Sequence, residues 1–273
     1  MKRKNLLVAL LFTALFVMVC YLPLSAGWII KSKTTGEYES SWNEMYLQNN
    51  VFKMLDEGHI FILNGNTRDL TFVNVQENTY WKGNLDDFKN KMKEFFGKAM
   101  NQMSAQMEEA MKNLTPEQRA MMEQMGKDNP MLNKMQGTKA KPPVVDIVST
   151  GEVMTIAKRS AKKYIIKSDG KKMEEVWLAE NMISSKDWNP EIFRDLAESM
   201  RMGMASSDYE DTDEYWNLHK KGIPLKTVYF QDEYTVVEEV LELTEKNLPA
   251  STFAPPSDCR EVSLEHIIQN MEE

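Results

Sequence analysis

The sequence predicts an α+β protein in which an antiparallel sheet is covered on one face by helices. Short apolar or alternating segments occupy residues 28–81 and 144–179, and turn residues separate them. Residues 84–135 between these groups have helical periodicity, and a last hairpin is predicted over 224–243. Because sequential strands joined by short loops pair antiparallel, the order strands, helices, strands predicts an antiparallel meander with one apolar face.

The first group of strands is expected to form a meander. Its segments are 29–30, 42–48, 51–55, 59–63 and 70–75. Asn64-Gly65 is a tight-turn signal between the last two of them. Asn84 is a candidate cap for the following helix, and Asp86 and Asp87 suit the positive end of that helix. The meander therefore leads directly into a helix that begins at Leu85.

The helical segment is rich in methionine. Residues 84–135 hold ten of the 21 methionines. One broad apolar stripe at helical spacing comprises Phe88, Met92, Phe95, Phe96, Ala99, Met103, Met107, Ala110 and Leu114. Thr115-Pro116-Glu117-Gln118 is typical of a capping box and predicts a second helix that ends near Gly126. Residues 127–143 are expected to be an exposed connector. Together these features predict a Met-rich helical hairpin.

The methionine stripe admits three interpretations. It fills an ordinary core, or it forms a lid over an apolar ligand, because thioether side chains adapt to varied shapes. The lid interpretation makes these residues candidates for a ligand-binding groove: Met92, Phe95, Phe96, Met103, Met107, Trp81 and Trp177. The third interpretation is a Cu(I) site, since soft sulfur suits that ion. No cysteine or histidine lies nearby to support it, so no metal site is assigned.

The second half of the chain returns to strands. They are expected at 146–157, 163–167 and 174–179, with Ser168-Asp169-Gly170 as a hairpin turn. Residues 185–201 are predicted to be helical and 206–214 to be an acidic, solvated loop. A final hairpin pairs 224–230 with 234–243, and 264–271 is a candidate short helix. These segments supply the other side of the sheet.

The N-terminus is typical of a secretory signal. Lys2-Arg3-Lys4 precedes an apolar run that ends in a proline and small residues, and we expect cleavage after Ala26. The alternative is an uncleaved membrane anchor, because residues 5–30 are uncharged. The remainder is expected to be a single domain over 27–257, with 84–142 as an insertion and 258–273 as a tail or short helix. Only Cys259 remains after cleavage, so the mature chain forms no internal disulfide.

Composition and motifs exclude several classes of function. The net charge of −8 argues against a nucleic-acid partner. The chain has no GxSxG, P-loop or GxGxxG motif, and His59, His219 and His266 lie in different segments. The acidic residues of 208–214 lack the glycine and bidentate glutamate of an EF-hand. We therefore expect no catalytic residues, no cofactor and no enzyme activity.

Three phrases of the sequence resemble a known family. They are 115–122 within the Met-rich insertion, then Gly151-Glu152 with Thr155-Ile156-Ala157 and Glu175-Val176-Trp177, and finally Gly222-Ile223-Pro224 with Phe253-Ala254-Pro255-Pro256. Over residues 28–257 the chain resembles an exported bacterial family of unknown function, whose fold is similar to the periplasmic lipoprotein carriers and receptors called LolA and LolB. The resemblance implies a curved antiparallel sheet, an incomplete barrel, with helices packed on its concave side. The insertion at 84–142 is longer than the helices of those carriers.

These observations together predict an exported, non-catalytic binding protein of the periplasm or the extracellular space. Its expected ligand is an acyl chain, a lipid or a lipid-modified protein held in an apolar groove beneath the Met-rich hairpin. An envelope protein is a possible partner. The alternatives are a periplasmic Cu(I)-binding protein that uses clustered methionines, or a structural envelope protein whose core is filled by its own side chains.

Overall fold

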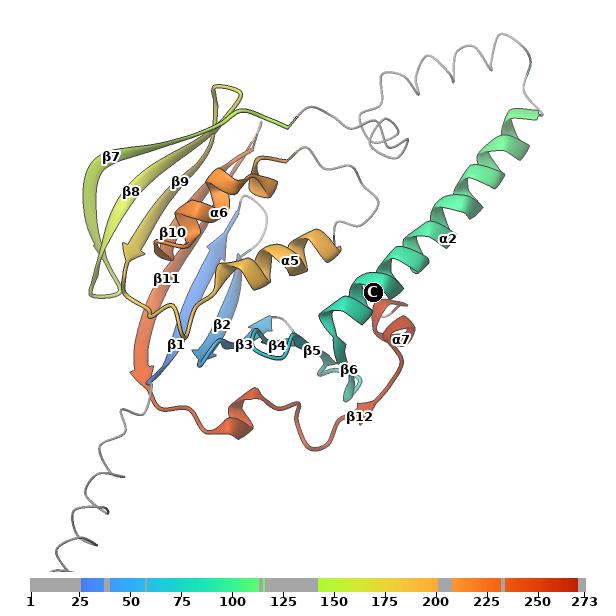
Figure 1. Cartoon of the computed structure of the whole chain (residues 1–273), viewed down its shortest axis with the longest axis horizontal. Coiled ribbons are helices and arrows are strands. Elements are labelled where there is room, and N and C mark those ends of the chain that lie inside the picture. The colour runs from blue at the N-terminus through green and yellow to red at the C-terminus, as the bar shows by residue number, and fades with distance from the viewer. Residues whose placement is uncertain are drawn as a thin grey trace, which may run out of the picture.

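A single twelve-stranded sheet, bent around two short helices, organises the computed structural model of the chain (Figure 1). The structure describes residues 26–36, 40–56, 58–112, 115, 142–200, 208–231 and 234–269. The strand order is β12-β6-β5-β4-β3-β2-β1-β11-β10-β9-β8-β7. The chain therefore begins in the middle of the sheet, meanders to one edge, and restarts at the opposite edge.

The first half of the chain forms an antiparallel meander and one long helix. Its elements are β1 (Gly27–Thr35), β2 (Ser40–Gln48), β3 (Val51–Asp56), β4 (His59–Asn64), β5 (Asp69–Asn74), β6 (Thr79–Asn84) and α2 (Leu85–Lys112). Each of these strands pairs with the next in antiparallel register. The predicted meander and the helix start at Leu85 are confirmed.

The second half of the chain returns toward the middle of the sheet. Its strands are β7 (Val145–Ile156), β8 (Arg159–Ser168), β9 (Lys171–Glu180), β10 (Gly222–Phe230), β11 (Thr235–Lys246) and β12 (Arg260–Glu261). Its helices are α5 (Pro190–Met200), η1 (Tyr209–Asp211), α6 (Asp213–His219), η2 (Ala250–Phe253) and α7 (Leu264–Gln269). β11 pairs antiparallel with β1, which joins the two halves into one sheet, and β12 pairs parallel with β6.

Residues with positive φ close several of the hairpins. Asn49 and Asn50 have φ of 52° and 59° between β2 and β3, and Asp169 and Gly170 have φ of 48° and 80° between β8 and β9. Two-residue loops with both φ values positive match the twist of antiparallel strands. Asparagine, aspartate and glycine tolerate this backbone best, so the sequence itself selects these turns.

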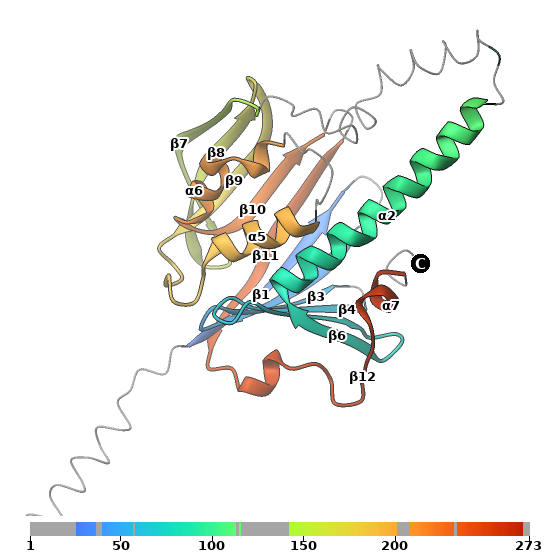
Figure 2. The same cartoon turned by 45° about the vertical axis from the view of Figure 1, so that its right-hand side comes forward.

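Local irregularities bend the sheet. The register shifts between Lys31 and Ser32 in β1, between Ser149 and Val153 in β7, and between Pro224 and Lys226 in β10. An extra residue in one strand bends that strand and increases its twist. The curved sheet encloses α5 and α6 on its concave side (Figure 2). The predicted α+β architecture with helices in the hollow of an incomplete barrel is confirmed.

Among the described side chains of helix α2, those that are buried against the sheet lie near its beginning. Leu85, Phe88 and Met92 are buried in the main core with Phe72 and Trp81 of the sheet. The ring centroids of Phe72 and Phe88 are 5.4 Å apart. Beyond Met92, each α2 side chain that the structure describes is half-buried or exposed, and the helix runs away from the sheet (Figures 1 and 2).

Two details differ from the sequence-based expectations. The segment predicted as a solvated acidic loop over 206–214 contains η1 and the start of α6, because the Thr212 hydroxyl accepts a hydrogen bond from the Tyr215 backbone N–H and caps the helix. The sheet also continues beyond residue 257, where β12 pairs with β6 and where Leu264 and Ile267 of α7 are buried.

Several predictions fall on residues outside the described part. They concern the signal over 1–26, of which only Ala26 is described, the second helix of the hairpin, of which only Thr115 is described, and most of the connector at 127–143. Among the described residues, no helix combines the length and apolar character that a membrane span requires.

Candidate functional site

A cavity of about 260 Å³ lies between the concave face of the sheet and the helices α5 and α6. Its floor comes from β1, β9, β10 and β11, and Met45 of β2 adds to it. The residues that line it are Ile30, Ser32, Met45, Glu174, Trp188, Phe193, Tyr215, Trp216, His219, Ile223, Pro224, Leu225, Lys226, Thr227, Tyr229, Glu238 and Val240. Most of the wall is aromatic or aliphatic, so the cavity suits an apolar group.

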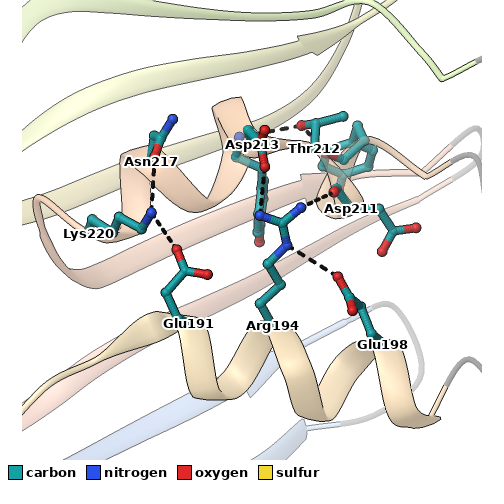
Figure 3. Close-up of polar contacts among 10 residues, drawn as sticks. Glu191, Arg194, Glu198, Asp211, Thr212, Asp213, Asn217 and Lys220 are labelled. Atoms are coloured by element: carbon teal, nitrogen blue, oxygen red, sulfur yellow. Dashed lines mark hydrogen bonds and ion pairs between the residues drawn. The ribbon is translucent and has the colours of Figure 1, made fainter.

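Ion pairs join the two helices that cover the cavity (Figure 3). Arg194 of α5 donates to the Asp213 carboxylate at 2.7 Å and to the Asp211 carbonyl oxygen at 3.2 Å. Lys220, directly after α6, forms an ion pair with Glu191 of α5. These contacts lie on the side of the helices that reaches solvent, since the Asp213 side chain is 76% exposed. They hold α5 and α6 side by side over the sheet.

Aromatic side chains anchor the start of α5 on the sheet. The Trp188 indole N–H donates to the His219 carbonyl oxygen at 3.3 Å. The Trp188 and Phe193 rings stack with centroids 4.9 Å apart, and Phe193 meets Phe52 of β3 edge-on at 4.8 Å. The cavity therefore has a wall that bridges α5, α6 and the sheet.

Glu174 is a fully buried carboxyl group in the lining. Its Oε1 accepts a hydrogen bond from the Tyr209 hydroxyl at 2.7 Å, whereas its Oε2 is buried and has no partner among the described residues. Burial raises the pKa of Glu174 to about 7, and the nearby charges of Glu210 and Asp208 add to the rise, while the Tyr209 hydrogen bond opposes it. Glu174 therefore changes its charge near neutral pH.

A histidine and a second glutamate also line the cavity. The His219 Nε2 is buried and has no partner among the described residues, and burial lowers the pKa of this histidine to about 4. Glu238 accepts a hydrogen bond from the Ser32 hydroxyl at 3.2 Å, and burial raises its pKa. At neutral pH the imidazole is therefore uncharged, and the buried charge of the lining comes from carboxylates.

Lys226, the lysine in the lining, contacts Glu239 and Trp177. The Lys226 Nζ is 2.6 Å from the Glu239 carboxylate and 5.9 Å from the Trp177 ring centroid. Trp177 and Glu174 lie on opposite faces of β9, because side chains alternate along a strand and the two are three residues apart. The Lys226 ammonium thus lies with Trp177 on the face opposite Glu174.

The residues predicted to form a groove do not come together at this cavity. Trp81 and Met92 are buried in the main core, and Trp177 belongs to the same core cluster. Phe95 and Phe96 are half-buried and contact each other at 5.8 Å between ring centroids. None of these five lines the cavity beneath α5 and α6.

The other two predicted residues, Met103 and Met107, lie in α2, and their side chains fall outside the described part. The assignment of the seven residues to a ligand groove stays a prediction. The described cavity itself lies under α5 and α6.

Sequence reasoning missed Glu174 and His219. Glu174 alternates with Val176 and Leu178 in β9, and this pattern places a carboxyl on an apolar face. Glu175 alternates in the same way with Trp177 and Ala179, so the pattern indicates a buried carboxyl in β9 without showing which of the two glutamates it is. His219 lies at the end of a seven-residue helix that was not predicted, so no periodic pattern marked it.

Comparison with known proteins gives a family for the chain. Residues 82–259 match the family described as domain of unknown function (DUF4412). The chain belongs to the DUF4412 family. The resemblance to a family of unknown function is thereby confirmed, and the matched region includes every strand and helix from α2 to η2. No curated protein matches the chain.

Several solved structures are similar to this DUF4412 protein. A structure of PNGF-II aligns at 10% identity with a TM-score of 0.40, covering 91% of this chain and 33% of that one. MucB in complex with MucA(peri) aligns at 10% identity with a TM-score of 0.36, covering 88% of this chain and 57% of that one. The Pseudomonas aeruginosa MucA/MucB complex aligns at 9% identity with a TM-score of 0.37, covering 88% of this chain and 59% of that one. The chain thus spans about a third of PNGF-II and under three fifths of the MucB chains.

Proposed function

We propose that this DUF4412 protein is an exported, non-catalytic binding protein of the cell envelope. Its ligand is the apolar part of an acyl chain, a lipid or a lipid-modified protein, held between the concave sheet and helices α5 and α6. The observation that carries the proposal is the apolar-walled cavity of about 260 Å³ under these helices. Export is inferred from the N-terminal sequence, whose charged start and apolar run are typical of a secretory signal.

The size of the cavity limits what enters it. Pockets for small ligands are commonly about 300–1,000 Å³. A volume of about 260 Å³ therefore suits one segment of a chain rather than a whole lipid. Burial of each CH₂ contributes about 0.8 kcal/mol, so six methylenes would contribute about 5 kcal/mol before the costs of association. A partly enclosed chain would thus bind without any catalytic residue.

Titration with the uncharged dye N-phenylnaphthylamine tests the proposal. The matched pair of variants is Val240→Phe, which adds a ring inside the cavity, and Val153→Phe, which makes the same change at a 61% exposed position of β7. We expect the wild type and Val153→Phe to bind the dye in the micromolar range, and Val240→Phe to lose at least tenfold in affinity (about 1.4 kcal/mol).

Circular dichroism and thermal unfolding check that Val240→Phe remains folded, since overpacking costs about 1–3 kcal/mol. Equal dye binding by a folded Val240→Phe variant and the wild type, or no dye binding by the wild type, would contradict the proposal.

A further inference from the structure

We propose that the cavity under α5 and α6 selects ligands whose apolar chain ends in a protonated primary amine, with Glu174 as the main counter-ion and Glu238 as the second. This inference rests on the proposed function, because it assigns the polar end of a ligand whose apolar part occupies the same cavity. It is carried by the unpartnered atoms of the lining, by the sign of its charges and by its aromatic walls.

The lining contains two polar atoms that lack partners. The Oε2 of Glu174 and the Nε2 of His219 are both buried, and neither has a hydrogen-bond partner in the described part of the chain. Leaving such an atom unsatisfied is destabilising, and more so when it is charged. The Oε1 of Glu174 already accepts from Tyr209, so Oε2 is the oxygen that remains without a donor. A ligand that donates hydrogen bonds would satisfy it.

The charges that face the cavity are negative. Glu174 and Glu238 have only hydroxyl groups, those of Tyr209 and Ser32, as hydrogen-bond partners in the described structure. The ammonium of Lys226 is engaged by Glu239 on the face of β9 that carries Trp177. His219 is neutral because burial lowers its pKa to about 4. A buried carboxylate without a cationic partner is destabilising, so an entering cation would gain the attraction that the protein does not supply.

The walls of the cavity also favour a cation. Five aromatic side chains line it: Trp188, Phe193, Tyr215, Trp216 and Tyr229. The face of an aromatic ring attracts a cation within about 6 Å of its centroid, and the attraction grows when the cation is desolvated. A primary ammonium has three N–H donors, so it can bind the Glu174 oxygen and still lie against these rings. An alcohol or a carboxylate would not use both features.

Isothermal titration at pH 8 with three probes of equal chain length tests the inference. The probes are decylamine, which is protonated at this pH, decanol and decanoate, each below its micelle concentration. We expect the wild type to bind decylammonium about tenfold more tightly than decanol, and decanoate more weakly than either. The variants are Glu174→Gln and Glu238→Gln, and Glu245→Gln is the control because it removes one charge at an exposed site of the same strand as Glu238.

We expect Glu174→Gln to reduce the preference for decylammonium over decanol to about twofold, and Glu238→Gln to reduce it partially, while both retain decanol binding. Glu245→Gln keeps the wild-type preference. Equal binding of the three probes, or a preference that survives in Glu174→Gln, would overturn the ammonium inference and leave the apolar binding function in place. Failure of all three probes to bind the wild type would overturn the proposed function itself.

Discussion

Glu174 and His219 make opposite contributions to the pH dependence of stability. The pKa of Glu174 is about 7 in the folded chain and 4.5 in the reference state, so the folded protein holds this proton more tightly. Its contribution to stability is therefore present at low pH and is lost as the pH rises from about 4.5 to about 7. The pKa of His219 is about 4, below its reference value of 6.5, so its contribution is lost as the pH falls through this range.

Substitution of Glu174 separates these two contributions. We expect Glu174→Gln to match the wild type in free energy of unfolding near pH 4.5 and to exceed it by about 1–3 kcal/mol at pH 8, because the variant no longer buries an ionised carboxylate. The amide oxygen of glutamine still accepts from Tyr209, so the fold is retained. Urea unfolding at pH 4.5, 6 and 8 measures the difference. Parallel pH profiles for the two proteins would contradict the titration of Glu174 near neutral pH.

Met92 and Phe95 distinguish core packing from surface packing within α2. Met92 is 8% exposed and belongs to the main core, whereas Phe95 is half-buried and packs on Phe96. We expect Met92→Ala to lower the free energy of unfolding by about 2–4 kcal/mol. Phe95→Ala should cost less than half as much, although the larger side chain is removed. Chemical denaturation of both variants gives the comparison, and equal losses would contradict the packing described for this helix.

At the scale of elements, α5 and α6 act as the cover of the cavity. Surface ion pairs between Arg194 and Asp213 and between Lys220 and Glu191 join them. Such pairs contribute about 0–1 kcal/mol each to stability, because solvent screens them. We expect these ion pairs to slow the opening of the cover. A ligand in the cavity leaves only when the helices separate from each other or from the sheet.

Breaking both helix-to-helix pairs should therefore change kinetics more than stability. We expect Arg194→Ala/Lys220→Ala to lose about 1 kcal/mol of stability and to release N-phenylnaphthylamine several-fold faster in stopped-flow experiments. Lys162→Ala is the control, because it removes an exposed ion pair with Glu180 that joins two strands. Identical release rates for the wild type and the double variant would show that α5 and α6 do not limit ligand exit.

At the scale of the whole molecule, the sequence predicts the sheet well because its signals are local. Turn residues such as Asn64-Gly65 and Ser168-Asp169-Gly170 mark hairpins, and strands joined by short turns pair antiparallel. The Met-rich stripe also predicts a helix correctly. Periodicity shows that this helix has an apolar face, but it does not show which element that face meets. Among the α2 side chains that the structure describes, the buried ones belong to the first turns of the helix, through Met92.

The cavity could not be placed from sequence for the same reason. It depends on a seven-residue helix, α6, whose start lies within an acidic segment, and on β10, whose bulge lies beside the lining residues Leu225 and Thr227. The bulge and the position of α6 over the sheet both depend on contacts between residues distant in sequence, although α6 itself begins at the local Thr212 cap. For Glu174 the sequence goes part of the way: alternation in β9 indicates a carboxyl on an apolar face, but Glu175 alternates in the same way with Trp177 and Ala179.

Mass spectrometry of organic extracts from the protein purified out of its own cell envelope tests the central claim most directly. If the cavity under α5 and α6 holds the apolar part of a natural ligand, the wild type and Val153→Phe carry a lipid or other amphiphile in near-stoichiometric amount. The folded Val240→Phe variant, whose added ring occupies the cavity, then carries little or none. Extracts free of any amphiphile, or equal amounts from all three proteins, would contradict the account.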